Sequence, residues 1–289
     1  MSKFFEMFQH GSTANILAGV GIVSLICAYL GVFVVLRRDA MAGVVLVHVS
    51  PFGMALALFL SGLMTTDAFM PVRLSPPFFA LVLTIIAATL IALVHRGRRP
   101  RYKTPAAAAW LAVGALTVML AASLALVGAA SIVHAKAEML YLLFGNRLSI
   151  SPGQIVGLAV LAVIVALVHA LFHKEFVFVS FDPDMAQALG VRPRLWNIVL
   201  FLTLGVTISI AIRAAGALAV FGLLVLPAAT ALLACRNLRL TFIVAVAVGA
   251  VCSLVGIAVS SMADLPTGPT IVAVSVVPVA IASLVRRQR

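Results

Sequence analysis

Charged residues are scarce in this chain of 289 amino acids. Only 10% of its residues are Asp, Glu, Lys or Arg, eight in all are acidic, and 64% are hydrophobic. About a quarter of the residues in ordinary soluble domains are charged. The composition therefore excludes a soluble globular protein. It predicts an all-α polytopic membrane protein that is surrounded by membrane lipid.

Cysteine is equally rare. Cys27, Cys235 and Cys252 lie in or beside apolar runs, and their spacing matches no metal-binding pattern. This distribution excludes a disulfide framework and a thiolate centre, and it indicates small core residues. The chain also has no phosphate-binding loop of the GxxxxGK[ST] type, so it cannot hydrolyse a nucleotide by that route. We expect no enzymatic activity, no permanently bound cofactor and an external source of energy.

Basic residues outnumber acidic ones and give a formal net charge of +12. They form short clusters at the ends of apolar runs and do not line one polar face, which argues against nucleic acid as a partner. Such clusters report the orientation of a membrane protein, because cytoplasmic segments carry an excess of Lys and Arg.

Long apolar runs make up most of the chain. Nine have the length of a membrane span, so the whole chain, 1–289, is expected to form one transmembrane domain. The first run is too long for a signal-peptide core and is retained as a span. Only Arg213 to Gly216 interrupts residues 195–234, which form either two spans or one broken helix. The runs are 14–36, 41–62, 78–95, 105–128, 152–172, 195–213, 215–234, 238–261 and 269–285.

The distribution of basic residues favours two spans in 195–234 and an amino terminus outside the cell. With nine spans in that orientation, all but five of the 20 Lys and Arg residues lie in cytoplasmic segments. The carboxyl terminus and residues 173–194 are then cytoplasmic. The five exceptions are Lys3, Arg73, Lys136, Arg147 and Arg213.

The cytoplasmic segment 173–194 contains a short helix with both ends marked. Asp182 is placed as its N-cap, Pro183 takes the first helical position, and Gly190 suits a left-handed C-terminal turn. A helix of about two turns is too short to build a domain, so its apolar face needs either the bilayer surface or another protein. Periodicity alone leaves both open. The residues of that face are Met185, Ala188 and Leu189.

Ionisable residues inside the predicted spans are functional candidates, because a charge in lipid is costly. His48 lies in the stretch GVVLVHVSPFGMALA and is followed by Pro51 and Gly53. This pattern predicts a soft-cation ligand beside a helix break that frees backbone carbonyls. The alternative is a hydrogen-bonded structural histidine, since no carboxylate lies one turn away.

Three other polar features are weaker metal candidates. His169 and His173 are four residues apart, a spacing that can grip a divalent cation, but they adjoin a lysine at the inner boundary, which favours a structural role. His134 and Glu138 are one turn apart in an outer segment and can meet an entering cation or water. Asp264 can cap the helix that follows it, and we favour this over a ligand role.

Five stretches, taken together and in this order, resemble the signature segments of the zinc and manganese permease family of bacterial ABC importers. The resemblance runs from about Gly31 to the carboxyl terminus. Each stretch alone is weak, but their joint order and spacing are specific. They are GVFVVLRRDAMAGVVLVHVSPFGMALA, EMLYLLFGNRLSIS, FVSFDPDMAQALGVRPR, GALAVFGLLVLPAATALL and DLPTGPTIV.

The resemblance implies a homodimeric permease of the bacterial inner membrane, with the fold of the vitamin-B12 importer. Its implied partners are a second copy of the chain, a cytoplasmic ABC ATPase dimer that binds ATP, and an extracytoplasmic metal-binding protein. The implied cargo is zinc or manganese. The short helix then corresponds to the coupling helix that docks into the ATPase. Its coupling residues are Asp182, Pro183, Met185, Ala186, Leu189 and Gly190.

One position departs from the family pattern. Members usually carry an Asp four residues before the membrane His, and here that position is Val44. A dehydrated cation loses its charged partner, so the transfer site is incomplete, rebuilt from elsewhere, or not used for a bare ion. His48 from two subunits can form a neutral pair of imidazoles that favours zinc over manganese. The alternatives are import of a metal chelate or small organic solute, and an ATP-independent secondary transporter.

Overall fold

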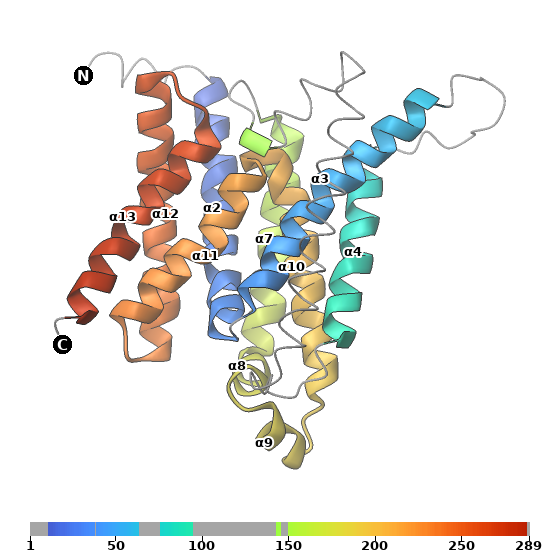
Figure 1. Ribbon diagram of the computed structural model, residues 1–289, viewed down its shortest axis with the longest axis vertical. Coiled ribbons are helices and arrows are strands. Elements are labelled where there is room, and N and C mark those ends of the chain that lie inside the picture. Colours follow the sequence, from blue (N-terminus) through green and yellow to red (C-terminus); the bar gives the residue numbers. More distant parts are fainter. Residues whose placement is uncertain (1–10, 38, 64–75, 95–142, 146–149, 288–289) are drawn as a thin grey trace. The chain divides into compact units, whose positions relative to one another are not determined.

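The computed structural model describes residues 11–37, 39–63, 76–94, 143–145 and 150–287, and the regular elements in these ranges are all helices (Figure 1). Eight helices of this described part are long and apolar enough to cross a membrane. The predicted span 105–128 lies outside it, as do His134 and Glu138. The chain divides into two compact units, which are described separately below.

The first unit contains five long helices and the last residues of a sixth. The helix nearest the amino terminus, α2, packs against α7, α11 and α12, while α13 packs against α11 and α12. The bounds of the five are α2 Gly11–Leu36, α7 Pro152–Leu171, α11 Ala217–Ala234, α12 Leu238–Ala263 and α13 Thr267–Arg287.

Local side-chain signals mark where these helices begin. Ser151 and Gln154 form a capping box at the start of α7: the Ser151 backbone N–H donates to the Gln154 side chain at 3.0 Å, and the Gln154 N–H donates to the Ser151 hydroxyl at 3.3 Å. At the start of α12, the Asn237 side chain accepts from the backbone N–H of Arg239 at 3.1 Å. Each bond satisfies a backbone donor that the first turn leaves free.

Gly216 separates the two helices that the sequence left uncertain. Its φ of 86° is disfavoured for a residue with a side chain, and it ends α10 (Pro193–Ala215) and precedes α11. Residues 195–234 therefore form two separate helices, as the distribution of basic residues predicted.

Close helix packing in the first unit depends on a glycine at the crossing of α2 and α11. A Cβ added to Gly31 would lie 1.8 Å from the backbone oxygen of Leu224. The rings of Tyr29 and Phe33, also on α2, pack against Phe242 of α12, with centroid distances of 5.2 and 5.0 Å. These aromatic contacts join helices that are distant in sequence.

The second unit consists of α3, α4, α8, α9 and most of α10. Gly53 of α3 lies against the backbone of Ala80 in α4, and Gly205 of α10 lies against Ala88 and Thr84 of α4. The hydroxyl of Ser50 donates to that of Ser209 across 3.5 Å between α3 and α10. The bounds are α3 Ala40–Leu63, α4 Pro76–Val94, α8 His173–Phe181 and α9 Pro183–Ala188.

The predicted helix break after His48 is wrong, because α3 continues through Pro51. A proline has no N–H to donate to the carbonyl four residues earlier, so the Val47 carbonyl loses its ordinary helical partner while the helix continues. The surrounding packing is enough to hold the helix together.

Candidate functional site

The short helix α9 begins as its sequence predicts. The Asp182 carboxylate accepts a hydrogen bond from the backbone N–H of Met185 at 3.1 Å, and Pro183 occupies the first turn. Asp184 adds a negative charge to the same turn, where the helix dipole favours it. These three residues hold the amino-terminal end of a helix that is too short to be stable alone.

The carboxyl end of α9 is closed by a Schellman motif. Gly190 has a φ of 83°, which confirms the predicted left-handed turn. The Val191 N–H donates to the Ala186 carbonyl at 3.0 Å, and the Gly190 N–H donates to the Gln187 carbonyl at 3.1 Å. With both ends capped, the helix keeps a defined shape while presenting a surface outward.

That surface is apolar, as the periodicity predicted. Met185 is 55% exposed and Leu189 is 68% exposed, and Ala188 is exposed beside them. Pro183 and Ala186 face the other way and are buried. Ala186 therefore anchors the helix to its own unit and does not take part in an outer contact. The exposed side chains form an apolar face on a rigid helix, which is typical of a protein docking site.

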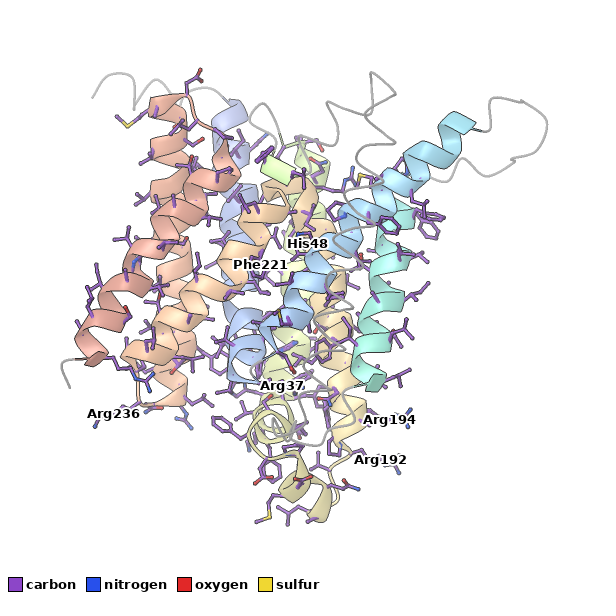
Figure 2. The ribbon with its side chains drawn as sticks, in the orientation of Figure 1. Arg37, His48, Arg192, Arg194, Phe221 and Arg236 are labelled. Carbon is purple, nitrogen blue, oxygen red and sulfur yellow. The ribbon has the colours of Figure 1, made fainter. Side chains whose placement is uncertain are left out.

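Two arginines follow this helix. Arg192 and Arg194 are both exposed, at the turn from α9 into α10 (Figure 2). They place positive charge close to α9, where it can steer an acidic partner.

His48 is held in a defined orientation within α3 (Figure 2). Its Nδ1 lies 2.8 Å from the carbonyl oxygen of Val44. A carbonyl can only accept, so Nδ1 must carry the proton, and the lone pair of the neutral ring is on Nε2. Metal-binding histidines are commonly oriented in this way, with one nitrogen bonded to a carbonyl and the other free to bind. In this chain the backbone carbonyl of Val44 accepts the hydrogen bond that orients the His48 ring.

His169 is a core residue of the first unit. It is fully buried in α7, and its ring packs against Tyr29 and Phe33 with centroid distances of 5.6 Å each. Helix α7 ends at Leu171 and α8 begins at His173, so the two histidines do not share one helix face. The structural role favoured by the sequence agrees with this packing.

Asp264 ends α12 in a left-handed backbone conformation, with φ 56° and ψ 35°. Its own N–H donates to the Ser260 carbonyl, so this aspartate has a C-terminal position on the preceding helix, whereas the sequence suggested a role at the start of the next one. Within the described ranges, no three His, Cys, Asp or Glu side chains come together as a metal site. A ligand role for Asp264 stays a prediction.

Glu175 is a residue that the sequence analysis did not single out. It lies in the first turn of α8, and its Oε2 is buried with no hydrogen-bond partner among the described residues. Burial of a carboxylate oxygen favours a nearby cation. The signal available in the sequence was an acidic residue directly after the lysine that ends an apolar run.

Comparison with known proteins establishes the family to which this chain belongs. The model of the ABC 3 transport family matches residues 9–286. The chain belongs to the ABC 3 transport family. Membership confirms the resemblance seen in the five sequence stretches, and it makes the chain a multi-pass membrane protein of a transport system.

The relatives of this chain are named for the transport of different metals. The manganese transport system membrane protein MntC of Listeria innocua is 27% identical over 94% of this chain and 89% of its own length. The high-affinity zinc uptake system membrane protein ZnuB of Haemophilus influenzae is also 27% identical, over 95% of this chain and 97% of its own. Overall identity therefore does not distinguish zinc from manganese.

A solved structure supports the fold of this family member. The chain superposes on PsaBC from Streptococcus pneumoniae in complex with Fab with a TM-score of 0.78, covering 97% of this chain and 94% of that one. The sequence identity is 20%, so the likeness concerns the fold alone.

Proposed function

We propose that this chain is the transmembrane permease subunit of an ATP-binding-cassette importer that moves a divalent metal ion into the cytoplasm. The observation that carries the proposal is family membership over residues 9–286, joined to a doubly capped α9 with an exposed apolar face. Relatives named for manganese and for zinc support a metal as the cargo. The chain itself performs no covalent chemistry.

Energy comes from a cytoplasmic ATPase dimer that docks on α9. Two copies of the chain form the transport path, with the fold of the vitamin-B12 importer, and an extracytoplasmic binding protein delivers the metal. The amino terminus lies outside and the carboxyl terminus in the cytoplasm, in the inner membrane of a bacterium. Movement of the two ATPase subunits displaces both α9 helices, which opens the path alternately to each side.

His48 is the ligand that we propose for the transport path. Its Nε2 lone pair is free for a cation because Nδ1 is bonded to the Val44 carbonyl. The site is neutral, since valine replaces the usual aspartate. Imidazole nitrogen suits zinc, whereas manganese prefers oxygen ligands, so zinc is the preferred metal.

Import of a metal chelate or of a small organic solute is the second candidate, and the observation that favours it is Val44. A ligand that keeps its own coordination shell needs no carboxylate in the path. An ATP-independent carrier is a third candidate, but it would need acidic residues within the membrane for ion coupling.

Uptake into vesicles tests these candidates. The chain is reconstituted with its ATPase and binding protein, and zinc, manganese, iron and a chelated metal are compared with and without ATP. We expect ATP-dependent uptake of zinc above manganese. Failure with every bare cation supports the chelate, and uptake without ATP or the ATPase contradicts the leading proposal.

Leu189→Gln tests the docking face of α9. The change removes an apolar side chain that is 68% exposed, while both caps of the helix remain. Burying a leucine at an interface contributes about 1.5–3 kcal/mol, so we expect roughly ten- to hundredfold weaker binding of the ATPase in a titration with the purified permease. Gln187→Ala, an exposed change on the same helix, serves as the control. Equal affinity of both variants contradicts docking through this face.

His48→Ala tests the proposed ligand. Loss of the imidazole leaves the cation without this nitrogen, and we expect ATP-driven zinc uptake to fall by roughly tenfold or more, by analogy with changes around metal ligands. Met41→Ala, an exposed site near the start of α3, is the control. Unchanged zinc uptake in His48→Ala removes this residue from the path.

A further inference from the structure

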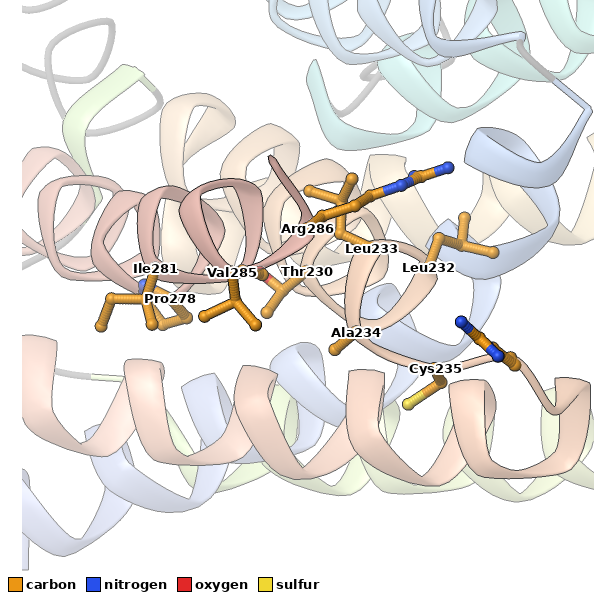
Figure 3. Close-up of a pocket in the computed structure, with 11 residues that line it drawn as sticks. Thr230, Leu232, Leu233, Ala234, Cys235, Pro278, Ile281, Val285 and Arg286 are labelled. Carbon is orange, nitrogen blue, oxygen red and sulfur yellow. The ribbon is translucent and has the colours of Figure 1, made fainter. Parts of the chain in front are cut away.

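An open groove lies between the ends of α11 and α13, within the first compact unit (Figure 3). Its volume is about 750 Å³. Most of its lining is apolar and includes Leu233, Ile281 and Val285. Arg236 and Arg286 line it as well, and both are exposed. The groove thus combines an apolar wall with two guanidinium groups.

The positive charge in this groove has no acidic counterpart on the helices that form it. The sequence contains no Asp or Glu from 217 to 263 or from 265 to 289. Asp264 lies at the opposite end of α12 from Arg236, and a helix of 26 residues separates them by about 39 Å. Two arginines without a local carboxylate favour an anion, and the fork of donors on each guanidinium matches phosphate oxygens.

The groove lies at the ends of two candidate membrane spans. Arg236 follows a candidate span that ends at Ala234, and Arg286 ends the span that begins at Thr267. Ile281 is 57% exposed and Val285 is 47% exposed, and both lie in the last two turns of that span. An aliphatic chain from the adjacent leaflet can cover these two side chains while its headgroup remains at the level of the arginines.

We propose that the groove binds one anionic phospholipid. The phosphate lies between Arg236 and Arg286, and an acyl chain lies along Ile281 and Val285. The bound lipid joins the ends of two helices that the groove separates. This site is independent of the metal path, so a negative result here would leave the proposed transport function unaffected, and the reverse is also true.

Competition between two lipids tests the proposal on the full chain. The purified protein in detergent is mixed with equal amounts of phosphatidylglycerol and phosphatidylcholine that carry the same acyl chains, and bound lipid is read by native mass spectrometry. We expect phosphatidylglycerol to be retained on the order of tenfold better, since each arginine near the membrane attracts an anionic lipid. Equal retention of both lipids overturns the proposal.

Matched variants locate the bound lipid. Arg236→Gln combined with Arg286→Gln is expected to abolish the preference. Arg192→Gln combined with Arg194→Gln removes the same charge from two exposed arginines outside the groove and is expected to keep it. If the first double variant fails to fold, Val285→Trp fills the apolar wall without a change of charge and is expected to reduce phosphatidylglycerol binding. Retained preference in the groove variants overturns the assignment.

Cys235 gives a direct readout, because it lines the groove and is partly exposed, whereas Cys27 and Cys252 are buried. We expect phosphatidylglycerol, but not phosphatidylcholine or inorganic phosphate, to slow maleimide labelling of Cys235. Protection by inorganic phosphate alone identifies a free-anion site and overturns the lipid. Lipid binding without protection places the lipid elsewhere. Protection that requires a second copy of the chain makes the groove a subunit contact and also overturns the proposal.

Discussion

Ala186→Pro is expected to abolish ATP-driven uptake while the protein still inserts into the membrane. The Ala186 N–H donates to the Asp182 carbonyl at 3.0 Å, and a proline cannot make this bond. The residue is also completely buried, so the proline ring has no room. A proline inside a helix costs about 3 kcal/mol or more, which exceeds what a helix of six residues can sustain.

The measurement separates coupling from folding. Uptake and ATP hydrolysis are assayed together in vesicles that contain the ATPase, and we expect uptake to fall about a hundredfold, in line with the lost helix stability. Hydrolysis continues without being linked to transport. Gln187→Ala changes an exposed neighbour and is expected to behave as the original protein. Normal uptake in Ala186→Pro contradicts a coupling role for α9.

Gly31→Ala is expected to produce the largest loss of stability of any single methyl group added to α2. The new Cβ would lie 1.8 Å from the Leu224 carbonyl oxygen, a backbone atom that cannot rotate away. Helices α2 and α11 must then move apart to relieve this clash. Overpacking of a core costs about 1–3 kcal/mol and occasionally more, and a clash with backbone belongs at the upper end.

Gly21→Ala is the matched control, because it adds the same methyl group to the same helix with nothing within 4 Å. Thermal unfolding in detergent compares the two. We expect a midpoint about 5 °C lower for Gly31→Ala, from a loss of roughly 3 kcal/mol in a chain of this size. Gly21→Ala is expected to stay within a few tenths of a kcal/mol, or to gain slightly, because alanine is the better helix former. Equal midpoints contradict the close crossing of α2 and α11.

Helix caps and membrane spans were predictable because the interactions that form them involve residues close together in the sequence. The α9 caps at Asp182 and Gly190 depend on hydrogen bonds between residues three to five apart, and both formed as predicted. The bounds of the described spans follow from continuous apolar length. The misjudged helix break at Pro51 shows the limit of such reasoning, since the packing of α3 outweighs one missing hydrogen bond.

Features that join distant segments could not be predicted in this way. The sequence drew attention to histidines four residues apart, but the tertiary structure buries His169 against Tyr29 and Phe33 and interrupts the helix before His173. The sequence also does not indicate which glycines are needed for close helix packing. Gly153 and Gly157 have a packing-motif spacing and open space around them, whereas the isolated Gly31 meets another backbone.

The amino-acid sequence by itself determined that this is a helical membrane protein with a short helix capped at both ends, and its signature stretches indicated the transport family. Only the tertiary structure decided that Ala186 is buried, how the His48 ring is oriented, and that Arg236 and Arg286 line one groove. The physical reason is the distance along the chain over which each interaction acts. Apolar length and capping act along the chain, whereas exposure, ring orientation and grooves depend on which side chains the folded helices bring together.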